Sequence, residues 1–344
     1  MPYVRPTTTR PLLLDGGMGT LLKPHIDPAD YTTLWSAAAF LTPEGERAVV
    51  TAHLAYLQAG ARMVLTNTYG CTQEMLAKRG QEAQQRAWIG RACALAQTAV
   101  AQHARDATSA EPIVVGGSLP PLGVSYRPDL AHDDAAMRAE YAVMADALVA
   151  GGVDVLVCET MASVREARVA VDVARTQGQG TPVWVAVTLA DTLDAGTGEA
   201  TLRSGEPLAA LVAAVGDAVD VLLVNCCRPD VATTALRTLR TRTPTPLGVY
   251  ANRFACVPCG WTLDSQGSTL ERRTDLDPEQ YAAYAREWRA LGAAVVGGCC
   301  GIGPGHIAAV GAVMAAGTDE DVHPTLNTSP NTLRAFAPAV TRPL

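Results

Sequence analysis

Two adjacent pairs of cysteines, Cys226-Cys227 and Cys299-Cys300, are the residues of this chain best suited to chemistry. The chain has nine cysteines, and an odd number that includes two adjacent pairs makes a poor disulfide framework. In a reducing compartment such clusters more often bind a metal or react. Three thiolates on one zinc ion leave the fourth tetrahedral position open for a substrate. The pairs therefore predict a zinc site, and the alternative is that they are small buried side chains.

The remaining cysteines give weaker signals. Cys93 and Cys158 are interpreted as small buried hydrophobic residues, and Cys71 is left open because it follows a predicted strand. Cys256-Val257-Pro258-Cys259 forms a CxxC unit, which is typical of metal and redox sites. Three interpretations stay open for it: an alternate ligand set, a redox-sensitive lid, or a coincidence.

Eight short runs rich in β-branched residues must position these cysteines, and a helical segment follows each run. Continuous Val and Leu runs suit strands that are buried on both faces of a parallel sheet. The predicted strands are Pro11–Asp15, Arg62–Thr68, Pro112–Ser118, Val153–Thr160, Pro182–Leu189, Val219–Cys226, Pro246–Asn252 and Ala293–Cys299.

The helical segments carry start and stop signals. Glu44–Ala59 follows Thr42-Pro43, a typical cap and first-turn proline, and ends at Gly60. Asp133–Ala150 and Pro278–Leu291 end at glycines in the same way. Eight such units predict an α/β fold, a (β/α)8 TIM barrel in one domain over residues 1–344 with a loosely held tail, 318–344.

The main alternative fold is an open doubly wound sheet, which would show a glycine-rich phosphate turn that opens a helix. Asp15–Gly19 is glycine-rich, but Pro24 and Pro28 follow it, so no helix is expected there. In a barrel the active site lies at the carboxyl ends of the strands. Polar residues and cysteines gather where the predicted strands end: Asp15, Gly16, Gly17, Asn67, Tyr69, Ser118, Glu159, Asn225, Cys226, Asn252, Cys299 and Cys300.

Composition excludes several classes of protein. Hydrophobic residues make up 48% of the chain and charged residues 18%, which supplies a large core. The net charge of -7 argues against partners such as nucleic acid or an anionic membrane. No stretch reaches the roughly 18 apolar residues of a membrane span, and the N-terminus lacks the apolar core of a secretion signal. We therefore expect a cytoplasmic protein.

Motifs along nearly the whole chain give a specific resemblance. They are LLLDGGMGT at Leu12–Thr20, LTNTYG at Leu65–Gly70, the GSLPPLGVSYRPD stretch from Gly117, Glu159-Thr160, VNC at Val224–Cys226 and GGCCG at Gly297–Gly301. With these motifs the chain resembles the homocysteine S-methyltransferase family, which includes betaine– and S-methylmethionine–homocysteine methyltransferases and a module of methionine synthase. GGCCG together with the upstream NC is the specific part.

The resemblance implies site residues. Cys226, Cys299 and Cys300 would bind Zn²⁺, and Cys227 would be a bystander. Glu159 would receive the substrate's ammonium group, and backbone at Asp15, Gly16 and Gly17 would hold its amino-acid end. Asn67, Tyr69 and Asn225 are candidates to contact the substrates. His306 is interpreted as a first-turn helix residue, not a ligand. The sequence departs mildly from the family's pattern at Ala251, where many members have proline.

The expected reaction is methyl transfer to homocysteine from a small onium donor, giving methionine. S-methylmethionine or S-adenosylmethionine is the favoured donor, and a betaine is the alternative. Trp35, Tyr69, Tyr126 and Trp261 are candidates for a cation-binding wall, although the sequence does not place them together. Two other classes stay open: a thiol redox protein using Cys256 and Cys259, and a catalytically silent zinc-binding protein. The short polar tail favours a monomer.

Overall fold

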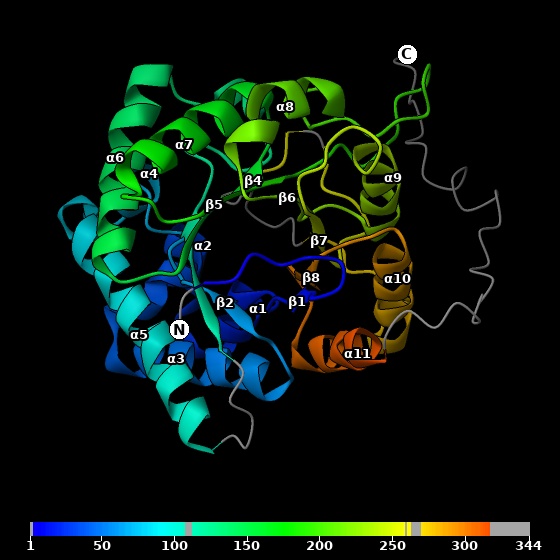
Figure 1. Cartoon of the computed structure of the whole chain (residues 1–344). Helices are drawn as coiled ribbons and strands as arrows, with labels where there is room; N and C mark the ends of the chain where they lie inside the picture. The colour runs from blue at the N-terminus through cyan, green and yellow to red at the C-terminus, as the bar shows by residue number, and fades with distance from the viewer. Residues whose placement is uncertain (1–2, 107–111, 259, 263–269, 317–344) are drawn as a thin grey trace, which may run out of the picture.

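The structure, a computed structural model, describes residues 3–106, 112–258, 260–262 and 270–316. Strands alternate with helices along the chain (Figure 1). Cys259 and the predicted tail 318–344 lie outside the described residues. The strands are β1 (Leu12–Leu13), β2 (Met63–Leu65), β3 (Val114–Leu119), β4 (Val155–Met161), β5 (Val183–Val187), β6 (Val221–Asn225), β7 (Leu247–Ala251) and β8 (Val295–Gly298).

The helices lie outside the ring of strands, and short 3₁₀ turns join some of them. The α-helices are α1 (Met18–Leu22), α2 (Pro28–Leu34), α3 (Pro43–Gln58), α4 (Gln73–Ala77), α5 (Gln85–Asp106), α6 (Asp134–Ala150), α7 (Val164–Gln177), α8 (Leu208–Val215), α9 (Pro229–Leu239), α10 (Pro278–Ala290) and α11 (Pro304–Ala315). The 3₁₀ turns are η1 (Lys23–His25), η2 (Trp35–Leu41), η3 (Glu82–Gln84), η4 (Pro128–Leu130) and η5 (Gly216–Ala218).

All eight strands are parallel and pair in the order β1-β8-β7-β6-β5-β4-β3-β2. A single parallel bridge between Leu14 and Met63 joins the two ends of this order and closes the ring. The predicted (β/α)8 barrel is therefore confirmed. Each predicted run overlaps one of the strands, and each strand is shorter than its run, although β3 and β4 each extend one residue beyond the predicted end, to Leu119 and Met161.

The continuous apolar runs bury both faces of the strands. In β4, Val155 and Val157 pack inside the barrel, whereas Leu156 and Cys158 pack against the surrounding helices. Alternate residues of a strand point to opposite faces, so both layers need apolar residues. Cys93 is fully buried in the same outer layer, as the sequence predicts for a small hydrophobic residue.

The predicted helix caps are confirmed. The Thr42 hydroxyl accepts the Gly45 N–H at the start of α3, and Asp133 and Asp277 cap α6 and α10 in the same way. After α6 the left-handed residue is Gly152, with φ of 74°, and not Gly151. Glycine suits these positions because a Cβ would strain a left-handed backbone.

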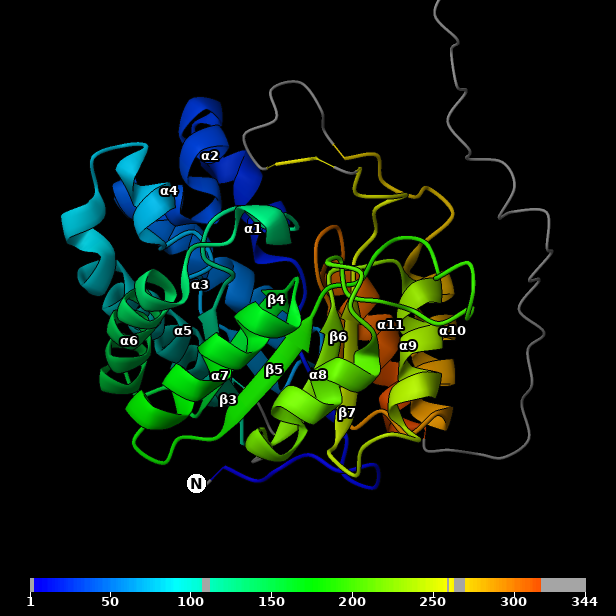
Figure 2. The ribbon, with the colours of Figure 1, turned by 90° about the horizontal axis from the view of Figure 1, so that it is seen from above.

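One sequence prediction is wrong. The glycine-rich turn does open a helix, the five-residue α1, and α2 begins at Pro28. Pro28 starts α2 because proline is tolerated in a first turn, and the Asp27 carboxylate caps that turn. Figure 2 shows α1, α2 and the loop after β7 at the same end of the barrel. Among the described helices, none has the length and apolarity that a membrane crossing requires.

Gly248 in β7 tests how tightly the barrel is packed. A Cβ there would lie 2.5 Å from both the Val295 carbonyl oxygen and Leu223 Cδ2. We expect Gly248→Ala to lower the free energy of unfolding by about 1–3 kcal/mol, measured by chemical denaturation. Gly90→Ala in α5 is the matched control, because its Cβ meets no atom within 4 Å. That substitution should stabilise the protein by about 0.5–1 kcal/mol, and equal effects at both sites would contradict the prediction.

Candidate active site

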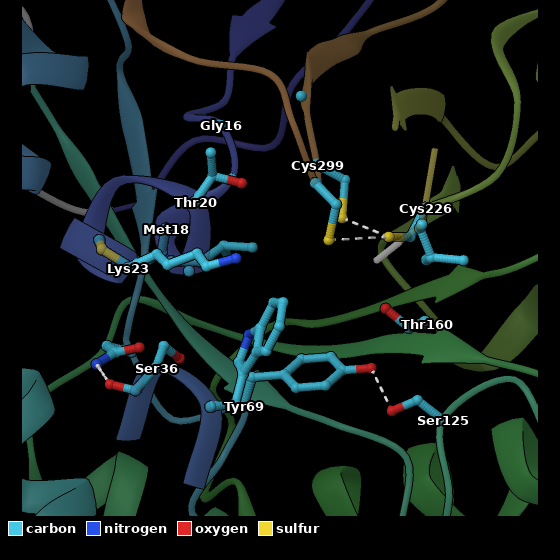
Figure 3. Close-up of a pocket in the computed structure, with 18 of the residues that line it drawn as sticks. Gly16, Met18, Thr20, Lys23, Ser36, Tyr69, Ser125, Thr160, Cys226 and Cys299 are labelled. Carbon is cyan, nitrogen blue, oxygen red and sulfur yellow. Dashed lines mark hydrogen bonds between the residues drawn. The ribbon is translucent and has the colours of Figure 1, made fainter. Parts of the chain in front are cut away.

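A cavity of ≈ 1040 Å³ opens at the carboxyl ends of the strands. Its wall contains all but one of the substrate and metal residues that the sequence proposed. Asn225 is the exception. Figure 3 labels Gly16, Tyr69, Cys226 and Cys299 among the proposed residues. The proposed residues on the wall are Asp15, Gly16, Gly17, Asn67, Tyr69, Glu159, Cys226, Cys299 and Cys300.

Three cysteine sulfurs gather on one side of this cavity. The Sγ atoms of Cys226, Cys299 and Cys300 all lie within 4.8 Å of one another. Strand β7 sets their spacing, because the Cys226 N–H donates to the Tyr250 carbonyl and the Cys299 N–H donates to the Ala251 carbonyl. The ends of β6 and β8 are thus fixed to consecutive residues of the strand between them.

This donor set fits a soft metal such as zinc. Zinc–sulfur bonds of about 2.3 Å in a tetrahedron separate the sulfurs by roughly 3.8 Å. Cys226 Sγ lies 3.7 Å from Cys300 Sγ, which matches this spacing, and 2.8 Å from Cys299 Sγ, which is shorter than it. Hydrogen bonding by the Cys299 and Cys300 thiols holds the pKa of Cys226 well below its usual value. A thiolate is the metal-binding form of cysteine.

Cys227 points away from this cluster. It is fully buried in the layer between barrel and helices, whereas Cys226 packs with Tyr126, Phe254 and Val257 over the cavity. Both cysteines follow the end of β6, and Cys226 has a left-handed φ of 47°, so a turn of the backbone and not strand alternation sends the two side chains to opposite sides.

Gly16 and Gly17 follow β1, and they allow the turn after β1 to pack directly against the turn after β8. A Cβ on Gly16 would lie 2.4 Å from the Ile302 carbonyl oxygen, and one on Gly17 would lie 2.6 Å from the Cys299 carbonyl oxygen. The Gly17 N–H donates to the Ile302 carbonyl at 2.9 Å. The turn that carries Cys299 is therefore held against backbone that has no side chains.

The Asp15 carboxylate is occupied within the fold. It accepts the Leu65 N–H at 2.9 Å, and burial raises its pKa well above the usual value. Its own N–H and carbonyl bond to Met63 and Gly298. Asp15 thus ties β1 to both neighbouring strands, which leaves backbone and not a free carboxylate at this part of the wall.

Glu159 is a buried carboxyl at the end of β4. The Ser118 hydroxyl donates to its Oε1, and the Tyr250 hydroxyl donates to Oε2 at 3.3 Å. Burial raises the pKa of Glu159 to about 7, and these hydroxyl groups oppose the increase. A carboxyl with a perturbed pKa in a cavity is a candidate for binding or catalysis.

Asn225 lies beneath the cavity wall and supports Thr160, the residue that follows Glu159. Its Oδ1 accepts the Thr160 N–H at 3.1 Å, and its Nδ2 donates to Thr160 Oγ1 at 2.8 Å. Thr160 has a left-handed φ of 61°, which is uncommon for a β-branched residue. Asn225 therefore fixes a strained turn beside Glu159.

Aromatic side chains form part of the cavity wall, and Tyr126 and Trp261 among them pack against the cysteine cluster. Trp35, Tyr69, Tyr126 and Trp261, which the sequence could not place together, all line the cavity. Tyr69 shares a 2.8 Å hydrogen bond with Ser125 (Figure 3). Aromatic faces attract cations, so this wall suits an onium group. The Asn67 amide donates to the Ser36 carbonyl, and its Oδ1 has no partner among the described residues.

Sequence reasoning missed the part that Tyr126 plays beyond the aromatic wall. Its hydroxyl lies 3.0 Å from Cys226 Sγ. The Arg203 guanidinium lies 5.2 Å from the centre of its ring, and Arg203 also pairs with the largely buried Asp191. These residues belong to loops after different strands, so no local sequence pattern indicates that they are in contact. Lys23 and Arg272 on the cavity wall were missed for the same reason.

His306 is not part of the cavity wall. It lies in the first turn of α11, where its Nε2 is 3.3 Å from the Leu276 carbonyl oxygen. This matches its interpretation as a helix residue.

Comparisons with known proteins agree on one family. The model of the family described as homocysteine S-methyltransferase matches residues 12–314. The homocysteine S-methyltransferase of Escherichia coli strain K12 is 32% identical over 309 residues, covering 87% of this chain and 94% of that protein. The betaine-homocysteine S-methyltransferase of Drosophila melanogaster is 27% identical, covering 88% and 94%. The metallated homocysteine methyltransferase MmuM of E. coli superposes with a TM-score of 0.71 at 29% identity, covering 88% and 96%.

The raised pKa of Glu159 predicts a pH effect on stability. The folded state keeps this proton up to about pH 7, whereas the unfolded state loses it near the ordinary glutamate pKa of about 4.3. The stabilisation is therefore complete below pH 4 and is lost as pH rises through 7. Relative to Glu159→Gln, the wild type should lose up to about 3 kcal/mol of unfolding free energy between pH 5 and 8. Denaturation of metal-free, reduced protein measures this, and a pH-independent difference would refute it.

Proposed function

The chain belongs to the homocysteine S-methyltransferase family and is a methyltransferase, and from this premise we propose that it methylates homocysteine in a zinc-dependent reaction, giving methionine. The convergence of three cysteine sulfurs beside a buried carboxyl supports this proposal most directly. The proposed donor is a small onium compound, with S-methylmethionine or S-adenosylmethionine preferred. A betaine is the second donor candidate because a relative carries that name.

The reaction needs one bond to form and one to break. The homocysteine sulfur attacks the methyl carbon of the donor, and a new carbon–sulfur bond forms. The bond between that carbon and the onium atom breaks, and its electron pair leaves with the donor as a neutral thioether or amine. Such a step needs little acid–base help, since the leaving group is already neutral on departure. No histidine is among the described residues of the cavity wall, which agrees with this chemistry.

The cysteines would hold the metal, and other residues would hold the acceptor. Cys226, Cys299 and Cys300 are the proposed ligands, and zinc bound there would keep the acceptor sulfur deprotonated at neutral pH. Glu159 would bind the acceptor's ammonium group, with the Ser118 and Tyr250 hydroxyls fixing the orientation of its carboxylate. Backbone at Gly16 and Gly17 would face the acceptor's carboxylate end.

The aromatic wall would position the donor and keep water away. Tyr126 and Trp261 pack edge to face at 5.7 Å over the cluster that contains Cys226. Holding the methyl group in line with the attacking sulfur is the main contribution that such a wall makes to the rate.

The zinc ligands are tested by Cys299→Ser. We expect the wild type to contain about one zinc per chain and to form methionine from homocysteine with at least one donor from a panel of S-methylmethionine, S-adenosylmethionine and betaines. Cys299→Ser should lose most of both, because hydroxyl is a poor ligand for a thiolate site. Cys256→Ala is the control, since Cys256 is exposed and lies outside the cavity wall. A thiol redox function predicts the reverse ranking of the two variants.

The role of Glu159 is tested by substrate kinetics. Glu159→Gln removes a buried charge that would pair with the acceptor's ammonium group, so KM for homocysteine should rise roughly 10- to 100-fold. Zinc content should stay near one per chain, because Glu159 is not a proposed ligand. An unchanged KM with zinc retained would remove Glu159 from the proposed binding site.

A further inference from the structure

The most buried ion pair among the described residues joins Asp191 to Arg203. Asp191 Oδ2 lies 3.4 Å from Arg203 Nη1, and the two side chains are only 12% and 10% exposed. Both residues belong to the loop 188–207 between β5 and α8, where an antiparallel bridge pairs Leu189 with Leu202. The bridge joins the two arms of this loop and places the acid beside the base.

Together the two side chains bind both backbone groups of one residue in another loop. The Val257 N–H donates to Asp191 Oδ2 at 2.7 Å, and Arg203 Nη2 donates to the Val257 carbonyl at 2.7 Å. Val257 lies between β7 and α10, in the loop that also carries Trp261. Hydrogen bonds to charged groups are stronger than neutral ones, so the pair holds the loop after β7 firmly at this residue.

Val257 belongs to the apolar cluster around Cys226. Its side chain packs in that cluster with Tyr126. The Arg203 guanidinium lies 5.2 Å from the centre of the Tyr126 ring, and that ring packs edge to face with Trp261 at 5.7 Å. The ion pair therefore contacts both of the loops that form the aromatic wall beside Cys226.

The pair is costly to bury. The attraction between two charges rarely offsets in full the cost of removing them from water. Asp191 Oδ1 is buried and has no hydrogen-bond partner among the described residues. Burial raises the pKa of Asp191, and the charge of Arg203 opposes that increase. A pair of this kind contributes little net stability, so its main effect is the conformation that it fixes, which here is the position of Val257.

We propose that Asp191 and Arg203 are positioning residues, which hold the loop after β7 closed over Cys226 and so shape the donor side of the cavity. Neither residue lines the cavity, so both act through Val257 and Tyr126. When the pair is broken, Val257 loses the partners of both its backbone groups and the loop opens. The effect on the donor rests on the proposed function, whereas the effect on the loop does not.

Access to Cys226 measures the position of the loop without any turnover. Cys226 is 2% exposed, and Cys227 is fully buried in the layer between barrel and helices. In metal-free, reduced protein, Arg203→Gln should raise the rate of Cys226 alkylation by iodoacetamide at least tenfold, because the loop no longer covers the sulfur. Asp191→Asn should raise it in the same direction. Cys227 should stay protected, which shows that the barrel is folded, and mass spectrometry of the modified peptide resolves the two cysteines.

Two further variants separate the loss of this contact from other effects. Arg242→Gln breaks an exposed ion pair with Glu199 in the same loop and should leave Cys226 protected. Arg203→Lys keeps a positive charge beside Asp191 but lacks the planar guanidinium that donates to Val257 as well. It should therefore show a smaller increase in alkylation, and it replaces Arg203→Gln if that variant does not fold.

Donor kinetics of the zinc-loaded enzyme test the consequence for the reaction. Arg203→Gln should raise KM for the onium donor at least fivefold, because the wall that positions the donor is displaced. KM for homocysteine should change less than twofold and zinc should stay near one per chain, whereas a general loss of structure would alter all three.

The two measurements distinguish the possible failures. Unchanged alkylation of Cys226 in Arg203→Gln overturns the positioning role. Faster alkylation with an unchanged donor KM overturns the role in donor binding. Faster alkylation in the variant, when even the wild type turns over no donor, supports the positioning of the loop and refutes the proposed function.

Discussion

The turn after β1 packs directly against the turn after β8, and this packing constrains both the fold and the site. Strand β1 has only two residues and meets β2 through a single bridge, so the ring of strands is thinnest there. Gly16 and Gly17 compensate, because without side chains their backbone touches the carbonyls of Ile302 and Cys299. The same contact fixes the turn that carries two of the three clustered sulfurs. This contact joins β1 to the turn after β8, whereas the Leu14–Met63 bridge and the hydrogen bonds of Asp15 to Met63 and Leu65 join β1 to β2.

Strained backbone gathers around the sulfurs, and local hydrogen bonds hold it. Thr160, Cys226 and Tyr126 all have left-handed φ values between 47° and 66°, although none is glycine. Such residues persist only where the surroundings fix them, and they are common at functional sites. Asn225 binds Thr160 through both ends of its amide, and the Cys226 N–H is held by the Tyr250 carbonyl. The energetic cost is thus met in part by Asn225, which does not line the cavity, and in part by the backbone of Tyr250, which does.

The barrel and the cysteine cluster could be predicted because their signals are local or carried by short motifs. Runs such as Val155–Cys158 mark a strand buried on both faces, and GGCCG lies at the end of another. The interpretation of Pro24 and Pro28 failed because Pro28 begins a helix there. The site's remaining contacts depend on how loops meet. Tyr126 and Cys226 are 100 positions apart, and nothing near either residue indicates that hydroxyl and sulfur lie 3.0 Å apart.

The three sulfurs are not equivalent, and the difference comes from outside the cysteine motifs. Among the three sulfurs, Cys226 Sγ lies 3.0 Å from the Tyr126 hydroxyl, and the Arg203 guanidinium lies 5.2 Å from the centre of that ring. Asp191 and the Val257 carbonyl keep Arg203 in this position. A metal held by the cluster would receive less charge from Cys226 than from Cys299 or Cys300. Outer partners of this kind tune a bound metal through its ligands, so the Tyr126–Arg203 pair would offset part of the electron density that three thiolates supply.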